Sequence, residues 1–134
     1  MNEVEAYLHL GSDYPFFPNL LHYGMIICGN ILHEGFVVVM TKMQGLQFNN
    51  QIWRDLGESG RTRMKETLKK AIQILRQKCM WHGDASKANV LYDSESGNVV
   101  LVDFEAMQDN SEHRFGIDGP EIISIMHPPV TFFS

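Results

Sequence analysis

Long hydrophobic runs and cysteines are scarce in this sequence. The longest apolar run, Phe36 to Met40, has five residues, whereas a helix that crosses a membrane needs roughly 20. Cys28 and Cys79 lie far apart and lack the paired spacing of a zinc site or a disulfide framework. The first five residues carry two acids and no basic side chain, unlike the start of a signal peptide. We therefore expect an intracellular, cytoplasmic protein that does not associate with membranes.

Basic side chains are outnumbered as well. The 134 residues hold 11 Lys and Arg against 16 Asp and Glu, so the net charge is −5. A nucleic-acid-binding surface needs an excess of basic side chains, and we expect no nucleic-acid partner. Nine of the acids lie between Asp84 and Glu121. Because carboxylates gathered around a cleft can hold Mg²⁺, this half of the chain is where we expect the chemistry.

Apolar periodicity predicts one long amphipathic helix over residues 60–79, with Ser59 as its N-cap. A short helix is expected to open the chain, with Val4, Tyr7 and Leu8 on one apolar face, ending at Gly11. The repeating stripe of the long helix consists of Met64, Leu68, Ala71, Ile72, Leu75 and Cys79.

Two β-hairpins are predicted from β-branched and apolar runs that flank turn residues. The first pairs Tyr23–Cys28 with Phe36–Met40, and the second pairs Asn89–Tyr92 with Val99–Phe104. A proline-containing loop over residues 12–19 precedes the first hairpin. The expected order is helix, hairpin, loop, long helix, hairpin and an irregular tail. This order predicts an α+β fold with a single domain.

Polar residues that could take part in catalysis or metal binding lie on both sides of the second hairpin. His82, Gly83 and Asp84 follow the long helix, Asn89 comes five positions after Asp84, and Asp103-Phe104-Glu105 ends the second strand. In this order they resemble the H-R-D, N and D-F-G motifs of the protein-kinase-like superfamily. The H-G-D form and the missing last glycine are similar to its atypical branches, RIO-like or aminoglycoside-phosphotransferase-like.

The resemblance implies transfer of the γ-phosphoryl group of Mg-ATP to a hydroxyl acceptor. Asp84 would accept the proton of that hydroxyl, Asp103 and Asn89 would bind Mg²⁺, and His82 would brace the loop. One alternative is a simple turn in which Asp84 and Asn89 satisfy backbone donors. Another is a hydrolase metal site made of His82, Asp84 and Asp103, which suits Mg²⁺ or Mn²⁺ better than Zn²⁺.

The same resemblance implies a nucleotide pocket. Residues 36–45 resemble the fifth strand and hinge of a kinase, with Met40 as the gatekeeper. The backbone of Thr41 and Met43 would then bind the adenine edge of ATP, and Leu91 would line the floor below the base. Plain core packing is the alternative for Met40 and Leu91.

The opening helix resembles kinase helix αC, whose glutamate pairs with a lysine. Glu3 is the residue that we assign to this role, with Glu5 as the alternative. A carboxylate that only stabilises the helix start is the competing explanation. Residues 119–121, Gly-Pro-Glu, resemble the A-P-E motif that closes an activation segment.

Several family features have no counterpart in these residues. Only two residues precede Glu3, which leaves no glycine-rich loop and no partner lysine. Ser86 stands where many kinases carry a phosphate-contacting lysine. A serine at this position resembles the RIO-type atypical kinases. The resemblance thus implies a truncated kinase-like domain, with residues 1–45 as the remnant of the small lobe and hinge and residues 46–134 as the start of the large lobe.

We expect such a chain to turn over ATP weakly or not at all. The alternative function is that of a non-catalytic kinase-like module that binds nucleotide or a partner chain. For the phosphotransferase, the hydroxyl acceptor is a protein or a small molecule. Apolar surface exposed by truncation is expected to favour self-association.

Overall fold

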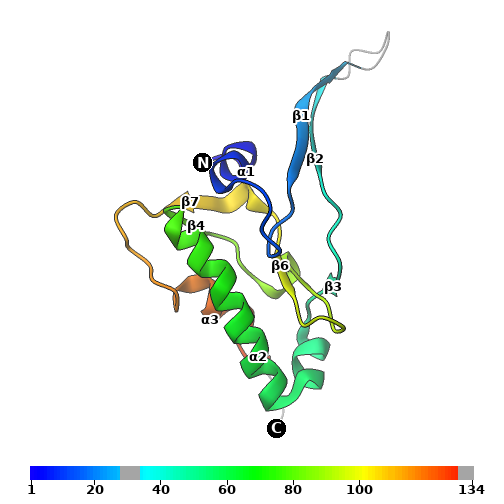
Figure 1. Ribbon diagram of the computed structural model, residues 1–134, viewed down its shortest axis with the longest axis vertical. Coiled ribbons are helices and arrows are strands. Elements are labelled where there is room, and N and C mark those ends of the chain that lie inside the picture. Colours follow the sequence, from blue (N-terminus) through cyan, green and yellow to red (C-terminus); the bar gives the residue numbers. More distant parts are fainter. Residues whose placement is uncertain (28–33, 130–134) are drawn as a thin grey trace.

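The computed structural model of the protein describes residues 1–27 and 34–129, and it has an α+β fold (Figure 1). Cys28 and most of the turn predicted after it lie outside the described residues. The elements are α1 (Glu3–Leu10), β1 (Leu20–Ile27), β2 (Glu34–Met40), β3 (Leu46–Gln47), α2 (Asn50–Gln77), β4 (Met80–His82), the 3-10 helix η1 (Lys87–Asn89), β5 (Val90–Tyr92), β6 (Val99–Leu101), the 3-10 helix η2 (Phe104–Ala106), β7 (Met107–Asp109) and α3 (Pro120–Met126).

Helix α1 is closed by local signals at both ends. The side chain of Asn2 accepts a hydrogen bond from the Glu5 amide at 2.8 Å, and the Glu5 carboxylate accepts one from the Asn2 amide at 3.2 Å. The helix ends at Gly11, as predicted, with a φ of 84°. The predicted apolar face was right at Tyr7 and wrong at Leu8, which is 57% exposed. The contacts of α1 with η2 and β1 select a different face, which buries Ala6, Tyr7 and Leu10.

Strands β1 and β2 form the first predicted hairpin. They pair antiparallel, with Leu20 opposite Met40 and Ile27 opposite Glu34. Figure 1 shows this ribbon projecting away from the helices and the smaller strands. Its exposed apolar side chains are Leu21, Tyr23 and Val39.

Helix α2 begins about ten residues earlier than expected and contains the predicted apolar stripe except Cys79, which follows the end of the helix and has a φ of 58°. Asn49 is its N-cap and accepts a hydrogen bond from the Ile52 amide at 2.9 Å. The helix is kinked at Gly57, whose φ of 68° and ψ of 178° are not helical. The assignment of Ser59 as N-cap was therefore wrong, because that residue lies inside the helix just after the kink. The stripe residues Met64, Leu68, Ala71, Ile72 and Leu75 are buried.

The second predicted hairpin is confirmed as β5 and β6, and β3 pairs with β5 in a sheet of order β3-β5-β6. Its second strand is shorter than the predicted Val99–Phe104: β6 ends at Leu101, because the left-handed backbone of Asp103 interrupts the extended chain before η2. A separate pair, β4 and β7, was not predicted. Strands of two or three residues are too short to show a period of two in the sequence. The expected irregular tail was also wrong, since α3 begins at Pro120 in the first helical position, where proline is favoured.

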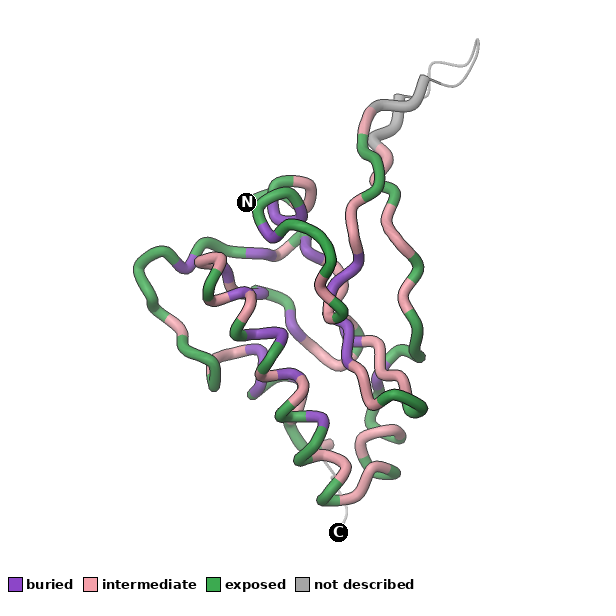
Figure 2. The backbone as a smooth tube through the Cα atoms, in the orientation of Figure 1, coloured by how far each residue is buried: buried purple, intermediate pink, exposed green. Residues whose placement is uncertain are grey.

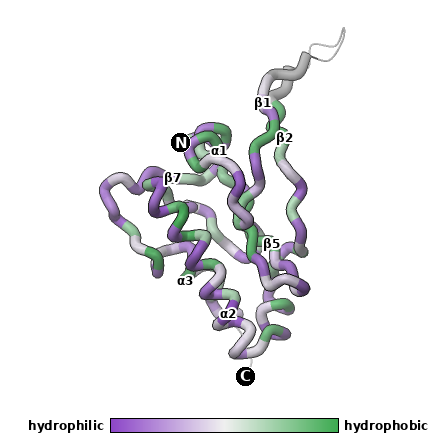
Figure 3. Tube along the Cα trace, in the orientation of Figure 1, coloured by the Kyte–Doolittle hydropathy of each residue, from purple (hydrophilic) through white to green (hydrophobic). Residues whose placement is uncertain are grey.

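The buried side chains form one core between α1, α2, α3 and the short strands, as the purple segments of Figure 2 show. Along α2, hydrophobic and hydrophilic residues alternate in Figure 3, as expected for an amphipathic helix. Phe104 lies at the centre of the core and stacks on Tyr7 with ring centroids 4.2 Å apart and an interplanar angle of 16°. This stack joins α1 to the motif that carries Asp103.

In the described part of the chain, no helix combines the length and the apolar character needed to span a membrane.

Candidate functional site

His82 ends strand β4 and is 1% exposed. Its Nδ1 accepts a hydrogen bond from the Asp84 amide at 3.1 Å, and its Nε2 lies 2.9 Å from the Val102 carbonyl oxygen. Because Nδ1 acts as an acceptor, the ring proton is on Nε2 and is donated to Val102. Both ring nitrogens are therefore engaged in hydrogen bonds with backbone groups, those of Asp84 and Val102.

Gly83 explains why the motif reads H-G-D. Its amide donates to the Ala106 carbonyl at 2.9 Å. A Cβ atom at this position would lie 2.5 Å from that same carbonyl oxygen, closer than atoms can approach. An arginine like that of H-R-D cannot stand here without moving this backbone away from Ala106 at the end of η2.

Asp84 and Asn89 face each other across the loop that ends in η1. The Nδ2 of Asn89 donates to the Asp84 carbonyl at 2.8 Å and to its Oδ2 at 3.3 Å. Asn89 thus binds a backbone acceptor, not the backbone donors that the simple-turn alternative assigned to these side chains. The contacts also turn the amide oxygen of Asn89 away from Asp84; Asp84 is exposed and Asn89 is half-buried.

Val102 holds the two ends of this loop next to Asp103. Its carbonyl accepts from His82, and its amide donates to the Asn89 carbonyl at 3.0 Å. The following residue, Asp103, is half-buried and has a left-handed backbone with φ 61° and ψ 77°. This conformation is uncommon outside glycine and often marks functional sites. Val102 thus links His82 and Asn89 directly before Asp103.

Helix α1 brings a further carboxylate to Asp103. The pKa of Glu3 is raised by partial burial, and the nearby charges of Asp103 and Glu105 raise it further. Burial also raises the pKa of Tyr7, to which Glu3 and Asp103 add. The Tyr7 hydroxyl is buried without a hydrogen-bond partner among the described residues. Glu3, the residue assigned to the αC role, therefore lies in a cluster that a cation would stabilise.

We expect Glu3→Gln to raise the thermal unfolding midpoint at pH 7. The folded-state pKa of Glu3 is above the ordinary value of a glutamate, so the ionised carboxylate destabilises the fold and protonation removes that penalty. The difference between variant and wild type should shrink as the pH falls and vanish below about pH 4. Glu112→Gln, in an exposed loop, is the control. If the unfolding midpoints of variant and wild type differed by the same amount at pH 7 and below pH 4, the charge cluster around Glu3 would be contradicted.

The predicted hinge residues adjoin the site through strand β3. The Thr41 amide donates to the Asn19 carbonyl at 2.9 Å, which ties the predicted hinge to the residue before β1. Leu91 is half-buried in β5 and lies opposite Gln47 of β3. Met40 packs against the core, in line with the packing alternative for this residue. The structure gives no contact that tests the role of Met43 in adenine binding.

Gln47 is a site residue that the sequence analysis missed. Its Nε2 donates to the Ala88 carbonyl at 2.9 Å, which ties the segment after the hinge to the loop that holds Asn89. No sequence signal distinguishes this glutamine from any other exposed polar residue of a short strand.

A buried ion pair below the loop was also missed. Arg76, in the last turn of α2, binds both carboxylate oxygens of Glu121, at 2.7 and 2.5 Å. Arg76 also donates to the Met80 and Gly116 carbonyls, and the His82 amide donates to Glu121 at 3.2 Å. The pair therefore anchors β4 immediately before the motif. Glu121 was noted in the sequence only as the last letter of a Gly-Pro-Glu motif.

Lys87 is not free to take the place of the phosphate-contacting lysine that many kinases carry. Its ammonium donates to the His127 carbonyl at 2.6 Å, at the end of α3, and burial lowers its pKa. The side chain is thus committed to holding η1 against α3. Its neighbour Ser86 stands at the position where the resemblance to kinase motifs would place that lysine.

The donor atoms present fit Mg²⁺ better than a transition metal. The described residues contain no group of three His, Cys, Asp or Glu side chains arranged to hold an ion. The proposed hydrolase site of His82, Asp84 and Asp103 is therefore not formed, and His82 has no nitrogen left for a metal. The carboxylate of Asp103 and the amide oxygen of Asn89 are the hard ligands that Mg²⁺ uses together with substrate phosphates and water.

Comparison with solved structures identifies the architecture. The chain is similar to WbdD in a co-crystal structure with the kinase inhibitor LY294002, with a TM-score of 0.59 and 22% identity over 82% of this chain and 23% of that chain. It is also similar to the Cydia pomonella granulovirus kinase PK-1, with a TM-score of 0.57 and 15% identity over 80% of this chain and 38% of that chain.

No protein-family model matches the sequence, and a comparison with curated proteins finds no match. The chain spans less than two fifths of either structural neighbour. At these identities the likeness concerns the fold, and it agrees with the order of helices, hairpins and motifs described above. The protein has a kinase-like fold.

Proposed function

We propose that this chain carries the metal- and nucleotide-binding part of a phosphotransferase that moves the γ-phosphoryl group of ATP to a hydroxyl acceptor. The observation that carries the proposal is the double contact of Val102 with His82 and Asn89, which keeps Asp103 beside the loop of Asp84. The kinase-like fold supports the same activity.

In this proposal Asp84 accepts the proton of the acceptor hydroxyl. The hydroxyl oxygen attacks the γ-phosphorus atom, and the bond from that phosphorus to the ADP oxygen breaks. Asp103 and Asn89 supply oxygen ligands for Mg²⁺, which neutralises phosphate charge when bound. His82 holds the Asp84 amide, so it positions the loop without reacting. The acceptor is a protein or small-molecule hydroxyl.

The nucleotide base is proposed to bind the backbone of Thr41 and Met43, above Leu91. Glu3 is assigned to the lysine partner role of helix αC. A supply of ATP and the free thiol of Cys79 are consistent with a cytoplasmic location.

Asp103→Asn is expected to weaken nucleotide binding in the presence of Mg²⁺ and to leave it nearly unchanged in EDTA. The substitution removes the charge that attracts the cation but keeps the size of the side chain. Titration calorimetry of ATP with and without Mg²⁺ measures the effect. Asp109→Asn, in the exposed end of β7, is the matched control. Equal affinity of the wild type in Mg²⁺ and in EDTA would remove Asp103 from this role.

The second candidate is a non-catalytic kinase-like module that binds nucleotide or a partner chain. It is favoured by Ser86 and by the commitment of Lys87 to His127. Loss of one preorganised cationic donor typically lowers the rate by about 10²–10³. Nucleotide binding without ADP formation by the purified chain would favour the module, whereas turnover that Asp84→Asn abolishes would favour the enzyme.

A further inference from the structure

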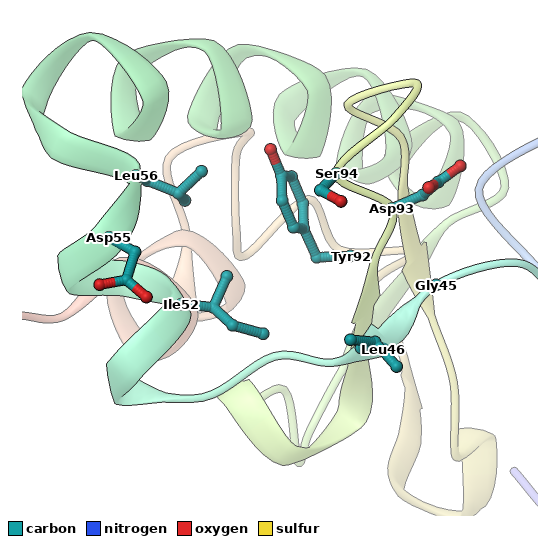
Figure 4. A pocket seen from close by; sticks show the side chains of 8 residues that line it. All are labelled: Gly45, Leu46, Ile52, Asp55, Leu56, Tyr92, Asp93 and Ser94. Atoms are coloured by element: carbon teal, nitrogen blue, oxygen red, sulfur yellow. The ribbon is translucent and has the colours of Figure 1, made fainter.

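An open cavity of about 380 Å³ lies between β3, the first turns of α2 and the end of β5 (Figure 4). It belongs to none of the elements that carry Asp84 or Asp103. Its lining residues are Gly45, Leu46, Ile52, Asp55, Leu56, Tyr92, Asp93 and Ser94.

The centre of this cavity is apolar. In Figure 4 the side chains of Ile52 and Leu56 point from α2 toward the ring of Tyr92, with Leu46 at the near edge of the cavity. Leu46 is 74% exposed although it is large and aliphatic. It belongs to β3, the edge strand of its sheet, where no further strand covers it in the described chain. An apolar side chain from outside would bury these four residues further.

The rim of the cavity is acidic. Asp55 and Asp93 are charged lining residues, and no lysine or arginine of the described part of the chain lines this cavity. The hydrogen bonds that these carboxylates accept come from the neutral groups of Gln51, the Glu95 amide and Ser96. Neither acid forms an ion pair within residues 1–27 and 34–129.

A second cavity of about 530 Å³ continues the first along α2, past the kink at Gly57. The two cavities share Asp55, Leu56, Tyr92 and Ser94, so together they form one groove. Glu66 and Glu95 line the second cavity together with Arg63 and Lys70. With Asp55 and Asp93, the groove has four acids against two basic residues and is net negative.

We propose that this groove is a docking site for an extended peptide segment of a partner protein, with an apolar anchor side chain followed by lysine or arginine. The anchor fills the space between Leu46, Ile52, Leu56 and Tyr92, and the basic side chains neutralise the acidic rim. The length of the two joined cavities favours an extended chain over a single small molecule.

Docking here leaves the proposed ATP site open. Successive side chains of a strand point to opposite faces, so Leu91 and Tyr92 of β5 serve different sides of the sheet. Tyr92 lines the groove, and Leu91 is the residue assigned to the adenine floor. The proposal therefore holds whether or not the chain transfers phosphate.

Fluorescence anisotropy with two labelled octapeptides tests the proposal. One has a leucine followed by two arginines, and the other has glutamates in place of the arginines. The basic peptide should bind at least about tenfold more tightly, and high salt should narrow the difference. Leu46→Ser and Asp55→Lys should each weaken its binding about tenfold or more. Leu21→Ser, at an exposed leucine on β1, is the matched control and should have no effect.

Thermal unfolding of each variant shows whether the fold is kept, which the exposure of Leu46 leads us to expect. Equal binding of the two peptides would overturn the proposal, as would no binding at millimolar concentration. An equal effect of Leu21→Ser and Leu46→Ser would also overturn it. Self-association of the free chain that Leu46→Ser alone abolishes would assign the groove to a second copy instead.

Discussion

Replacement of Glu121 by alanine is expected to destabilise the protein by about 3–5 kcal/mol. The substitution leaves the Arg76 guanidinium buried without its carboxylate and removes the acceptor of the His82 amide. Removal of one partner of a buried pair costs more than the pair contributes, because the remaining charge keeps its desolvation penalty. Urea denaturation monitored by circular dichroism measures the change.

The chain offers a matched control for this prediction. Lys69 and Asp118 form a second ion pair at 3.1 Å, but their side chains are 38% and 73% exposed. Asp118→Ala should therefore cost less than about 1 kcal/mol. A similar loss of stability in both variants would show that the burial of Glu121 does not decide its contribution. Hydrogen exchange of the His82 amide should also accelerate in Glu121→Ala and stay unchanged in Asp118→Ala.

Asp84→Asn is expected to lower kcat by about 10²–10⁴ in any form of the protein that turns over ATP. Asparagine keeps an oxygen that can accept the hydrogen bond of Asn89, so the loop should retain its structure. What it lacks is the ability to take the proton of the acceptor hydroxyl. Nucleotide affinity should therefore change little, which separates loss of chemistry from loss of binding.

Asp109→Asn serves as the control here as well. Coupled assays of ADP formation give kcat, and calorimetry gives the affinity for ATP. Turnover that survives in Asp84→Asn would assign proton acceptance to another group. A parallel loss of ATP binding would mean that Asp84 acts on the nucleotide rather than on the acceptor.

Local signals in the sequence were enough for the long helix and both hairpins. The stripe from Met64 to Leu75 repeats at helical spacing, and each hairpin consists of β-branched runs around turn residues. Such patterns depend on neighbours within a few positions, so they can be recognised without knowledge of the fold. The order of His82, Asp84, Asn89 and Asp103 likewise predicted the kinase-like fold.

Other features depend on contacts between distant residues. Leu8 is exposed and Ala6 is buried because α1 packs on η2 and β1, and periodicity in eight residues could not select between these faces. The first turns of α2 were missed because Gly57 interrupts the helix and separates them from the apolar stripe.

The sequence by itself determined which residues carry the proposed chemistry, because their types and order are local properties of the chain. Tertiary structure alone decided what supports them. Arg76 meets Glu121 across 45 positions, and Gln47 meets Ala88 across 41 positions. No local pattern selects these partners, since an arginine in a last helical turn or a glutamine in a short strand is stable in solvent too. Only the packing of α2, α3 and β3 around the loop brings them together and withdraws the ion pair from water.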